Sequence, residues 1–480
     1  MKAIPIYASF NTLSTNLRAI IKFGGTAVVS ADRIKHITDI IKENKDKEIV
    51  IVVSAIRGIT DKLINVCKDI EKGKREDLEE FIKDISAQHI DIINNAINNH
   101  DIRRDTKKRI EELLSDMSTM LHSMNVLGEV TPRSMDYIVS FGERLIAPIV
   151  ASALNDAGIK SEAFTGKDAG ILTDSTFGEA IPLMDTTRLR VKKNLEPLLK
   201  EGIIPVVTGF VAADQYGHIT TLGRGGSDYT ATILADALDA DEVWLMTDVD
   251  GLMTADPKIV SNAKVIREVS YAEAMELALF GAKYMHPRAL EPVQEKSIPV
   301  RIRNVFKPKD LGTLIVKEPS SDSKQIVKSV SMIKDLALID VRGSSMAGAP
   351  GTAGKIFNVL GEARVNIIMI SQGPSESSIS MVVRKNDLDK AVTSLELNLL
   401  GRLIKNVNVT DDVAVIAAVG SGMRGIKGVA SRIFQAVANQ GINVIMIAQG
   451  SSELDLAFVV DAKDSKDAVR AIHDEFRLGN

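Results

Sequence analysis

A lysine followed by two glycines stands directly after an apolar segment, as Lys22-Phe23-Gly24-Gly25-Thr26. Adjacent glycines let backbone N–H groups approach an anion closely, and the lysine supplies a full positive charge. A helix-like run follows, and the N-terminus of a helix there would add positive dipole. The segment is not the P-loop pattern G-x-x-x-x-G-K-[ST]. It therefore indicates a phosphate site of another kind or, alternatively, a plain turn from a strand into a helix.

A second glycine-rich segment, Gly223-Arg224-Gly225-Gly226-Ser227-Asp228, precedes the uncharged run 229–235 and also predicts a turn that opens a helix. The planar guanidinium of Arg224 could bind a carboxylate or a phosphate, and Asp228 could hold a cationic group or a metal ion. Two such turns in one chain favour an anion-binding site over two ordinary turns.

Polar residues also follow the apolar run 242–246, where Thr247 and Asp248 begin the segment TDVDG. Ligands bind beyond the carboxyl ends of the strands in open parallel sheets, so these two residues are candidates for nucleotide contact. The alternative is an ordinary Asp-Gly turn. The segment FGAKYMHP at 280–287 places Lys283 beside a glycine after a run rich in Ala, Glu and Met. A single lysine of this kind is usually solvated.

The elements that must position these residues follow from the pattern between residues 19 and 316, where short β-branched runs alternate with helical patterns. This alternation predicts an α/β fold with a mostly parallel sheet sandwiched by helices. Strands are predicted at residues 19–23, 48–53, 203–208, 242–247 and 300–304. Four of them are almost wholly apolar, as strands buried on both faces should be. Two long helices outside the sheet are predicted at 77–99 and 104–124.

The last third of the chain contains an internal repeat. The segment GSSMAGAPGTAGKIF…VNIIMISQGPSE recurs as GSGMRGIKGVASRIF…INVIMIAQGSSE at a constant offset of 77 residues (423 − 346 = 77). Each copy predicts a ferredoxin-like βαββαβ module. The second copy has no residues left for a final strand, and a spare β-like segment at 326–332 precedes the first copy. We therefore expect 326–332 to complete the sheet of the second module, so that the two modules are interleaved.

Composition places the chain among ordinary folded proteins. Lys+Arg number 59 and Asp+Glu 63, giving a net charge of −4 (59 − 63), and this balance argues against a nucleic-acid partner, which needs clustered cations. The single Cys67 excludes an internal disulfide and a multi-cysteine metal site, and we expect a cytoplasmic protein. No sufficiently long apolar run predicts a membrane span. The basic run 103–109 is expected to lie on a solvated helix face.

Together, the segments resemble the aspartokinases within the amino-acid kinase family, and the repeat resembles a tandem pair of ACT modules. The matching segments, in family order, are KFGGT, SAIRGIT, SFGER, TGF, LGRGGSDYTA, TDVDG and FGAKYMHP. The resemblance covers nearly the whole chain. It implies an N-terminal extension at 1–18, a catalytic domain at 19–317, a linker at 318–325, a first ACT module at 326–410 and a second at 411–480.

The resemblance implies phosphorylation of the β-carboxylate of L-aspartate by ATP, with Mg²⁺ accompanying the nucleotide and no further metal assigned. The product would be 4-phospho-L-aspartate, the first step toward lysine, threonine and methionine. By family role, Lys22 and Asp228 form the catalytic pair. The nucleotide would be held by Lys22, Gly24, Gly25, Thr26, Thr247, Asp248, Met253, Lys258, Lys283 and Tyr284. Aspartate would be held by Ser54, Thr60, Glu143, Phe210, Arg224 and Ser227.

Elementary chemistry agrees with these roles, because an α-ammonium group suits a carboxylate such as Glu143 and an α-carboxylate suits the fork of Arg224. Individual residues have structural alternatives. Ser54 and Thr60 could cap a helix, Phe210 could belong to the core, and Glu143 could be a buried partner of the neighbouring arginine. Two departures from the family concern groups near the nucleotide: Ala27 stands where members usually carry Ser, and Met253 where they often carry Tyr.

The ACT pair implies regulation by an end-product amino acid bound at a module interface, with Met346, Gly348, Gln372 and Gln449 as the site residues. Glutamines followed by Ser- and Glu-rich turns most resemble the threonine-responsive members, so we expect threonine rather than lysine. The alternative is a buried glutamine satisfied by the backbone. ACT pairs commonly associate across subunits, and we expect a homodimer or homotetramer.

Two other classes of function remain open at this point. One is another acid kinase of the same fold, acting on glutamate, acetylglutamate or carbamate, which would lack the tandem modules. The other is a catalytically silent amino-acid sensor, which would lack Lys22 or Asp228, and both residues are present. We expect no homoserine dehydrogenase within these 480 residues.

Overall fold

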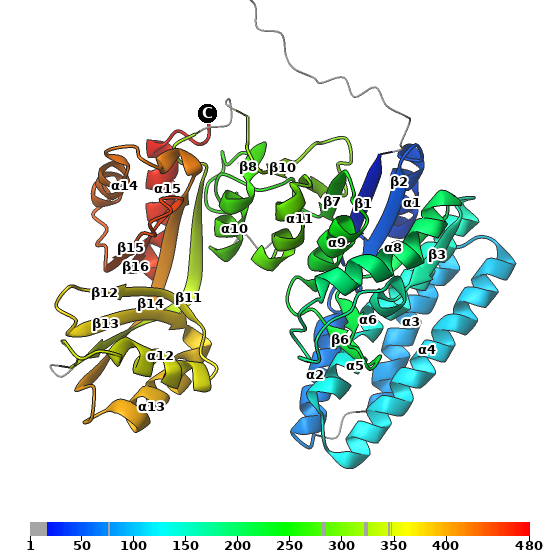
Figure 1. Ribbon diagram of the computed structural model, residues 1–480, viewed down its shortest axis with the longest axis horizontal. Helices are drawn as coiled ribbons and strands as arrows, with labels where there is room; N and C mark the ends of the chain where they lie inside the picture. The colour runs from blue at the N-terminus through cyan, green and yellow to red at the C-terminus, as the bar shows by residue number, and fades with distance from the viewer. Residues whose placement is uncertain (1–16, 75–76, 281–284, 321–324, 344–345, 347) are drawn as a thin grey trace, which may run out of the picture. The chain divides into compact units, whose positions relative to one another are not determined.

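The computed structural model describes residues 17–74, 77–280, 285–320, 325–343, 346 and 348–480 (Figure 1). Backbone packing divides the chain into two compact units. The first comprises Met1–Val249 with Arg288–Lys309, and the second comprises Asp250–Pro287 with Asp310–Asn480. The catalytic residues predicted around the glycine-rich turns fall in the first unit, and the repeated modules fall in the second.

A parallel sheet forms the centre of the first unit, which confirms the predicted fold class. Its strands lie in the order β3-β4-β2-β1-β7-β9, and every neighbouring pair is parallel. Such strands read as continuous apolar runs because both faces are covered by helices; β2, for example, is buried at every residue but its first. The strands are Arg18–Phe23 (β1), Glu48–Val53 (β2), Ser161–Phe164 (β3), Ile204–Thr208 (β4), Glu242–Thr247 (β7) and Val300–Asn304 (β9).

Helices cover this sheet, and the two long ones expected outside it are α3 and α4, which run side by side in Figure 1. Asp77 and Asn99 cap their N-termini by accepting backbone hydrogen bonds. A short hairpin, Val211–Ala213 (β5) and Ile219–Thr221 (β6), lies outside the main sheet. The helices are Ala31–Glu43 (α1), Ile59–Glu71 (α2), Leu78–Ala96 (α3), His100–Leu127 (α4), Pro132–Val139 (α5), Phe141–Asp156 (α6), Gly166–Ala169 (α7), Met184–Lys200 (α8), Gly226–Ala237 (α9) and Glu291–Lys296 (α11).

The continuous helical segment Pro132–Asp156 is long and apolar enough to cross a membrane by length and composition. Its apolar window is 83% buried inside the protein, so its hydrophobicity is explained by its place in the core. No second helix of this kind occurs in the described parts of the chain.

The second unit combines a short catalytic-domain portion with the two repeated modules. The first portion contains the parallel pair Glu268–Ser270 (β8) and Thr313–Val316 (β10), and the helix Tyr271–Leu279 (α10). The modules share one six-stranded antiparallel sheet in the order β12-β13-β11-β14-β16-β15. Its strands are Ser329–Arg342 (β11), Ile367–Gln372 (β12), Ser378–Arg384 (β13), Asn406–Val419 (β14), Met446–Ala448 (β15) and Asp455–Asp461 (β16).

Two strands, β11 and β14, each serve both modules. The first residues of β11 pair with the end of β14, from Ser329 opposite Val419 to Ile333 opposite Val415. The later residues of β11 pair with β13 and with the beginning of β14. The segment before the first module thus completes the sheet of the second. Each module has its own core and two helices: Thr352–Glu362 (α12) and Leu388–Leu399 (α13) in the first, Val429–Ala438 (α14) and Ser465–Glu475 (α15) in the second.

Candidate active site

The ends of four parallel strands meet at one edge of the first unit's sheet. The last residue of β1, Phe23, pairs with Val53 at the end of β2 and with Met246 near the end of β7. Val53 in turn pairs with Thr208, the last residue of β4. The residues that follow these strands therefore come together at the carboxyl edge of the sheet, where α/β folds bind ligands.

Lys22 and Asp228 form an ion pair at this edge, with Nζ and Oδ1 separated by 2.6 Å. Their side chains are only 13% and 9% exposed, so water screens the pair weakly. Lys22 is the last residue but one of β1, and Asp228 lies in the first turn of α9, whose N-cap residue Gly225 has a φ of 73°. The left-handed backbone at Gly225 directs the chain into the helix, and only glycine adopts it readily.

The turn after β1 approaches the loop after β2 so closely that a side chain would not fit. A Cβ on Gly25 would lie 2.6 Å from the carbonyl oxygen of Ala55, whereas one on Gly24 would lie 3.5 Å from its nearest neighbour. The helix that the sequence predicts after this turn is α1. α1 begins at Ala31, because its N-cap is Ser30 and the turn closes on itself through a hydrogen bond from Ala27 N–H to Gly24 O.

Glu143 supplies a buried carboxylate to the same edge. It lies in the first turn of α6, is 3% exposed, and its Oε1 accepts a hydrogen bond from the backbone N–H of Ala55 at 3.0 Å. Its other oxygen, Oε2, has no hydrogen-bond partner within the described residues. Burial raises the pKa of Glu143 to about 8, which the Ala55 hydrogen bond and the charge of Lys22 offset only in part.

The neighbouring Arg144 does not neutralise this carboxylate in the structure. Its guanidinium stacks over the ring of Phe141 at 4.2 Å and over that of Tyr137 at 5.3 Å. The alternative of a buried Glu143–Arg144 pair therefore does not describe the geometry. A buried carboxylate with one unpaired oxygen is suited to receive a cationic group from a ligand.

Phe210 is held in an unusual backbone conformation, with a φ of 66°. A bulky residue rarely occupies this left-handed region, and such strain is concentrated at functional sites. The backbone N–H of Phe210 donates to Thr230 Oγ1 on α9, and a Cβ on Gly226 would lie 2.7 Å from the Phe210 ring. A Cβ on Gly209 would likewise lie 2.6 Å from the side chain of Ser227. The β4 end and the start of α9 thus pack against each other through glycine.

The remaining residues predicted to hold aspartate are accessible. Arg224 is exposed in the turn before α9, and Ser54 and Thr60 are half-buried. Neither hydroxyl caps α2, since the N-cap of this helix is Gly58 and no side chain bonds there. The alternative role of helix capping is therefore excluded for both residues.

The predicted nucleotide residues are divided between the two units. Thr247 ends β7 in the first unit and Asp248 follows it, with its carboxylate 3.9 Å from Arg57. Met253 and Lys258 lie in the second unit, where Met253 is half-buried and Lys258 is exposed. Thr26 is half-buried in the turn after β1, and Ala27 is buried. Lys283 and Tyr284 lie outside the described residues.

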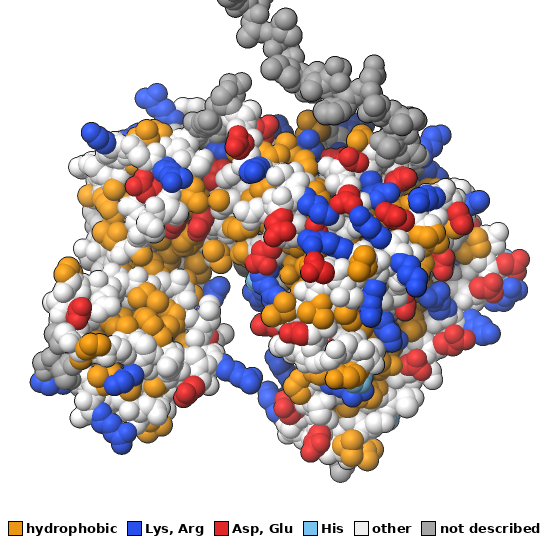
Figure 2. Space-filling view, in the orientation of Figure 1, with side chains coloured by type: hydrophobic (Ala, Val, Ile, Leu, Met, Phe, Trp, Pro, Cys, Tyr) orange, Lys and Arg blue, Asp and Glu red, His pale blue; other side chains and the backbone are white. Residues whose placement is uncertain are grey.

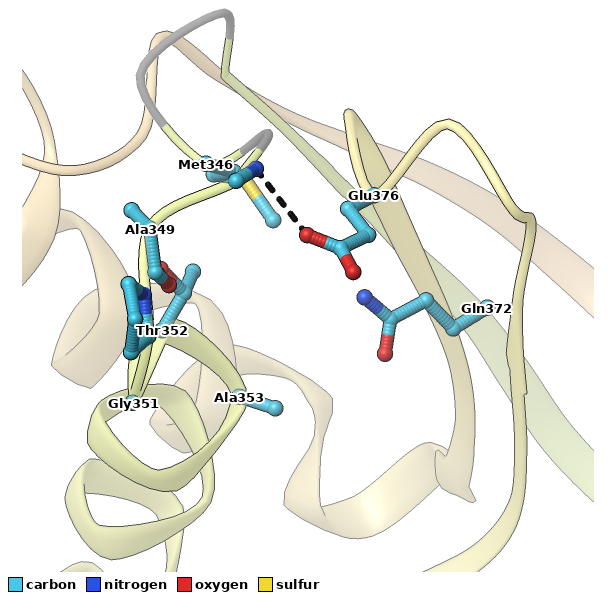
Figure 3. A pocket seen from close by; sticks show the side chains of 9 residues that line it. Met346, Ala349, Gly351, Thr352, Ala353, Gln372 and Glu376 are labelled. Carbon is cyan, nitrogen blue, oxygen red and sulfur yellow. Dashed lines mark hydrogen bonds between the residues drawn. The ribbon is translucent and has the colours of Figure 1, made fainter.

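The first module contains a hollow of about 380 Å³ (Figure 3). It is lined by the predicted residues Met346, Gly348 and Gln372, together with Thr352 and Glu376. Glu376 Oε2 accepts a hydrogen bond from the Gly348 N–H at 3.0 Å, and Figure 3 shows the Gln372 amide beside this carboxylate. Gln372 is exposed, so the alternative of a buried, backbone-satisfied glutamine does not apply.

The second module repeats the hydrogen bond between a glutamate carboxylate and a glycine N–H, but its predicted residue Gln449 does not line the hollow of the first module. Glu453 Oε2 accepts from the Gly425 N–H, at the same offset of 77 residues (453 − 376 = 77). Gln449, the fourth predicted residue, follows β15 and is exposed, and it does not line the hollow of the first module.

Sequence reasoning missed residues that act through close packing. Gly209, Gly142 and Gly226 each leave no room for a Cβ beside a site residue. Gly142 and Gly226 lie within the recognised segments SFGER and LGRGGSD, so their position offered a signal. The backbone N–H of Ala55, which binds Glu143, offered none, because a main-chain donor leaves no trace in the residue type.

The comparisons with known proteins identify the family. Residues 18–304 match the model of the amino acid kinase family, and residues 339–399 and 416–476 each match an ACT domain. The chain is 31% identical over 477 residues to aspartokinase 1 of Arabidopsis thaliana, covering 96% of this chain and 80% of that protein. The chain belongs to the aspartokinases.

Bifunctional aspartokinases are also similar to this chain. A bifunctional aspartokinase/homoserine dehydrogenase of Zea mays is 33% identical over 471 residues, covering 95% of this chain and 50% of that protein. The chain thus spans about half the length of the bifunctional aspartokinases that it matches.

Solved aspartokinase structures share the fold along nearly the whole chain. Escherichia coli aspartokinase III in complex with aspartate and ADP has a TM-score of 0.81 at 27% identity, covering 95% of this chain and 99% of that one. The same enzyme in complex with lysine and aspartate has a TM-score of 0.79 at 28% identity, with the same coverage.

Proposed function

We propose that this aspartokinase transfers the γ-phosphoryl group of ATP to the β-carboxylate of L-aspartate, giving 4-phospho-L-aspartate. The observation that carries the proposal is the buried Glu143 carboxylate, with one oxygen unpaired, at the same sheet edge as the Lys22–Asp228 pair. Glu143 would receive the α-ammonium group of the substrate, and the exposed Arg224 its α-carboxylate. The E. coli enzyme of the same fold was solved with aspartate and ADP, which supports this assignment.

The reaction needs charge neutralisation more than proton transfer. The nucleophile is a carboxylate whose unperturbed pKa is about 3.9, so it is ionised near neutrality and needs no general base. It must instead approach the negatively charged phosphates of ATP. Lys22 lies where it can offset this repulsion, and Asp228 holds its ammonium group in place through the 2.6 Å ion pair. Positioning and electrostatics dominate phosphoryl transfer in general.

Mg²⁺ fits this site as a companion of the nucleotide. Within the described ranges, no group of three or more His, Cys, Asp or Glu side chains could form a protein-only metal site. Mg²⁺ usually binds through substrate phosphates, waters and one or two carboxylates, and Asp228 and Asp248 are two carboxylates at this edge that could take that part. The ion would supply further neutralisation of the phosphate charge.

A coupled assay of ATP consumption tests the proposed function. Aspartate should support turnover, whereas glutamate and acetylglutamate should not. Turnover with glutamate or acetylglutamate in place of aspartate would establish the related acid kinases instead. Binding of amino acids without any turnover would establish a silent sensor.

We further propose that threonine is the effector of the first ACT module. Among the described residues that line the hollow, Glu376 is the only acidic one, and it is already bonded to Gly348 N–H. The ε-ammonium group of lysine would need a second carboxylate, whereas the Gln372 amide can bond a ligand hydroxyl. Isothermal titration should show threonine binding that Gln372→Ala weakens and Gln449→Ala does not. Lysine binding without threonine binding would refute the assignment.

We also propose that the ACT modules carry subunit contacts in a homodimer or homotetramer. β12 and β15 are the two edge strands of the six-stranded sheet, and Ile370 and Ile447 on them are 43% and 47% exposed. Figure 2 shows hydrophobic side chains gathered over the first module near β12 and β13. β12 and β15 also contact each other, so their exposed apolar side chains, rather than open strand edges, are what favour association. Sedimentation of the wild type against Ile370→Lys and Ile447→Lys tests this, and an unchanged mass in both variants would contradict it.

A further inference from the structure

A buried carboxylate outside the proposed substrate contacts links two parts of the active site. Asp136 lies on α5, is 2% exposed, and uses both oxygens. Its Oδ2 accepts hydrogen bonds from the backbone N–H of Thr221 at 2.8 Å and of Gly178 at 2.9 Å. Its Oδ1 accepts from the hydroxyl of Thr221 at 2.9 Å. Three donors from two separate segments therefore converge on one side chain.

Asp136 connects two segments, and each of them carries a residue proposed to hold aspartate. On one side, α5 ends at Val139. The N–H of the next residue, Ser140, donates to the carbonyl oxygen of Asp136, and α6 follows with Glu143 in its first turn. On the other side, Thr221 ends β6 and is followed by the turn that carries Arg224.

The segment that follows Thr221 also contacts Phe210 and the loop that contains Gly178. Leu222 N–H donates to the carbonyl oxygen of Phe210 at 2.9 Å. A Cβ on Gly223 would lie 3.3 Å from the carbonyl oxygen of Gly178, so the start of the Arg224 turn rests on the loop that Asp136 binds. Displacing Thr221 would therefore displace Phe210 and Arg224 with it.

We propose that Asp136 is a positioning residue that sets the Glu143 segment and the Arg224 turn at the separation required to hold aspartate by both its ammonium and carboxylate groups. This inference rests on the proposed function. Asp136 touches neither substrate nor nucleotide in this role; it acts through Thr221 and through the helix start that carries Glu143.

An ionised carboxylate satisfies every group that faces Asp136. Its Oδ2 accepts from two backbone N–H groups, and its Oδ1 accepts from the Thr221 hydroxyl. Burial raises the pKa of Asp136, and the hydrogen bonds from Gly178 and Thr221 counteract this by favouring the ionised form. Asparagine could keep its oxygen toward the two backbone N–H groups and donate its NH₂ to the Thr221 hydroxyl oxygen, whereas alanine would leave all three donors without this partner.

Steady-state kinetics of Asp136→Ala, which removes all three hydrogen bonds, tests the proposal. The KM for aspartate should rise about 10- to 100-fold, the range expected when a buried hydrogen bond to a charged group is lost, while the KM for ATP changes little. Asp214→Ala is the matched control. Asp214 is also buried and accepts backbone hydrogen bonds, from Tyr216 and His218, but at the far end of the same hairpin. It should leave both KM values unchanged.

A second variant covers the case in which Asp136→Ala does not fold. Thr221→Val removes only the hydroxyl bond and keeps both backbone bonds, so it should raise the KM for aspartate by a smaller factor, again without changing that for ATP. Equal changes in both KM values, or none in a folded variant, would overturn the positioning role. If the wild type itself fails to phosphorylate aspartate, the proposed function fails, and the result is distinct from a failure of this inference.

Discussion

Replacing Glu143 by Gln should separate two effects of this residue. One is the free-energy cost of burying its charge, and the other is its contribution to the binding of aspartate. The pKa of Glu143 is raised from 4.5 to about 8 by burial, so in the unliganded protein the carboxyl is mostly protonated at pH 7. A folded-state pKa above the unfolded value means that stability is fully present below pH 4.5 and is lost as the pH rises toward 8. Glutamine keeps the oxygen that accepts the Ala55 N–H and does not titrate.

The size of the effect on stability follows from the shift in the pKa of Glu143. The free energy of unfolding of Glu143→Gln, relative to wild type, should grow by about 1.4 kcal/mol per pH unit between pH 5 and 8 and then level off, for a total on the order of 4 to 5 kcal/mol. Denaturant unfolding at several pH values without ligand measures this difference. Glu162→Gln, on the exposed Glu162 of β3, is the control and should show no such trend.

Aspartate binding should reverse the protonation of Glu143, because the substrate's ammonium group favours the carboxylate. With a pKa of about 8, binding at pH 7 should release about 0.9 proton and at pH 9 about 0.1. Isothermal titration in buffers of different ionisation enthalpy measures the release. Equal release at the two pH values, together with a stability difference that does not depend on pH, would refute the reasoning.

Three further perturbations test the catalytic and regulatory parts separately. Lys22→Ala should lower kcat at least about 100-fold through loss of charge neutralisation, and calorimetry should find effector binding by the ACT modules unchanged; full activity would remove Lys22 from the mechanism. Gly25→Ala should nearly abolish activity, since its Cβ would lie 2.6 Å from a carbonyl oxygen, whereas Gly24→Ala, at 3.5 Å, should retain most of it; equal rates would contradict the packing argument. Lys328→Met removes one partner of a buried ion pair and should cost about 3 to 5 kcal/mol of unfolding free energy; Lys405→Met, at the equivalent exposed position of the other module (405 − 328 = 77), is the control and should leave stability unchanged.

The strands of the first unit could be predicted from sequence because each is buried on both faces. An apolar run such as the one ending at Val53 is unambiguous when no face is exposed to water. The interleaving of the modules could also be predicted, because the repeat shows that the second copy lacks a strand and that the segment before Ser329 can supply one. The pattern of apolar residues is sufficient to predict the strands, and the length of the repeat is sufficient to predict the interleaving.

The start of the helix after Gly25 could not be predicted in the same way. Glycine and small polar residues permit either a helix or an open turn, and the choice is made by contact with the loop after β2. The strained φ of Phe210 has the same origin, since its neighbours on α9 force a conformation that its own residue type disfavours.

The amino-acid sequence by itself determined which residue types line the carboxyl edge of the sheet, since Lys22, Arg224 and Asp228 could be named from glycine-rich turns placed after apolar strands. Only the tertiary structure decided what those residues experience. The raised pKa of Glu143 and the convergence of three donors on Asp136 arise from burial and from backbone groups distant in the chain. Solvent exclusion and main-chain hydrogen bonds depend on where the chain folds, and the identity of a residue does not encode them.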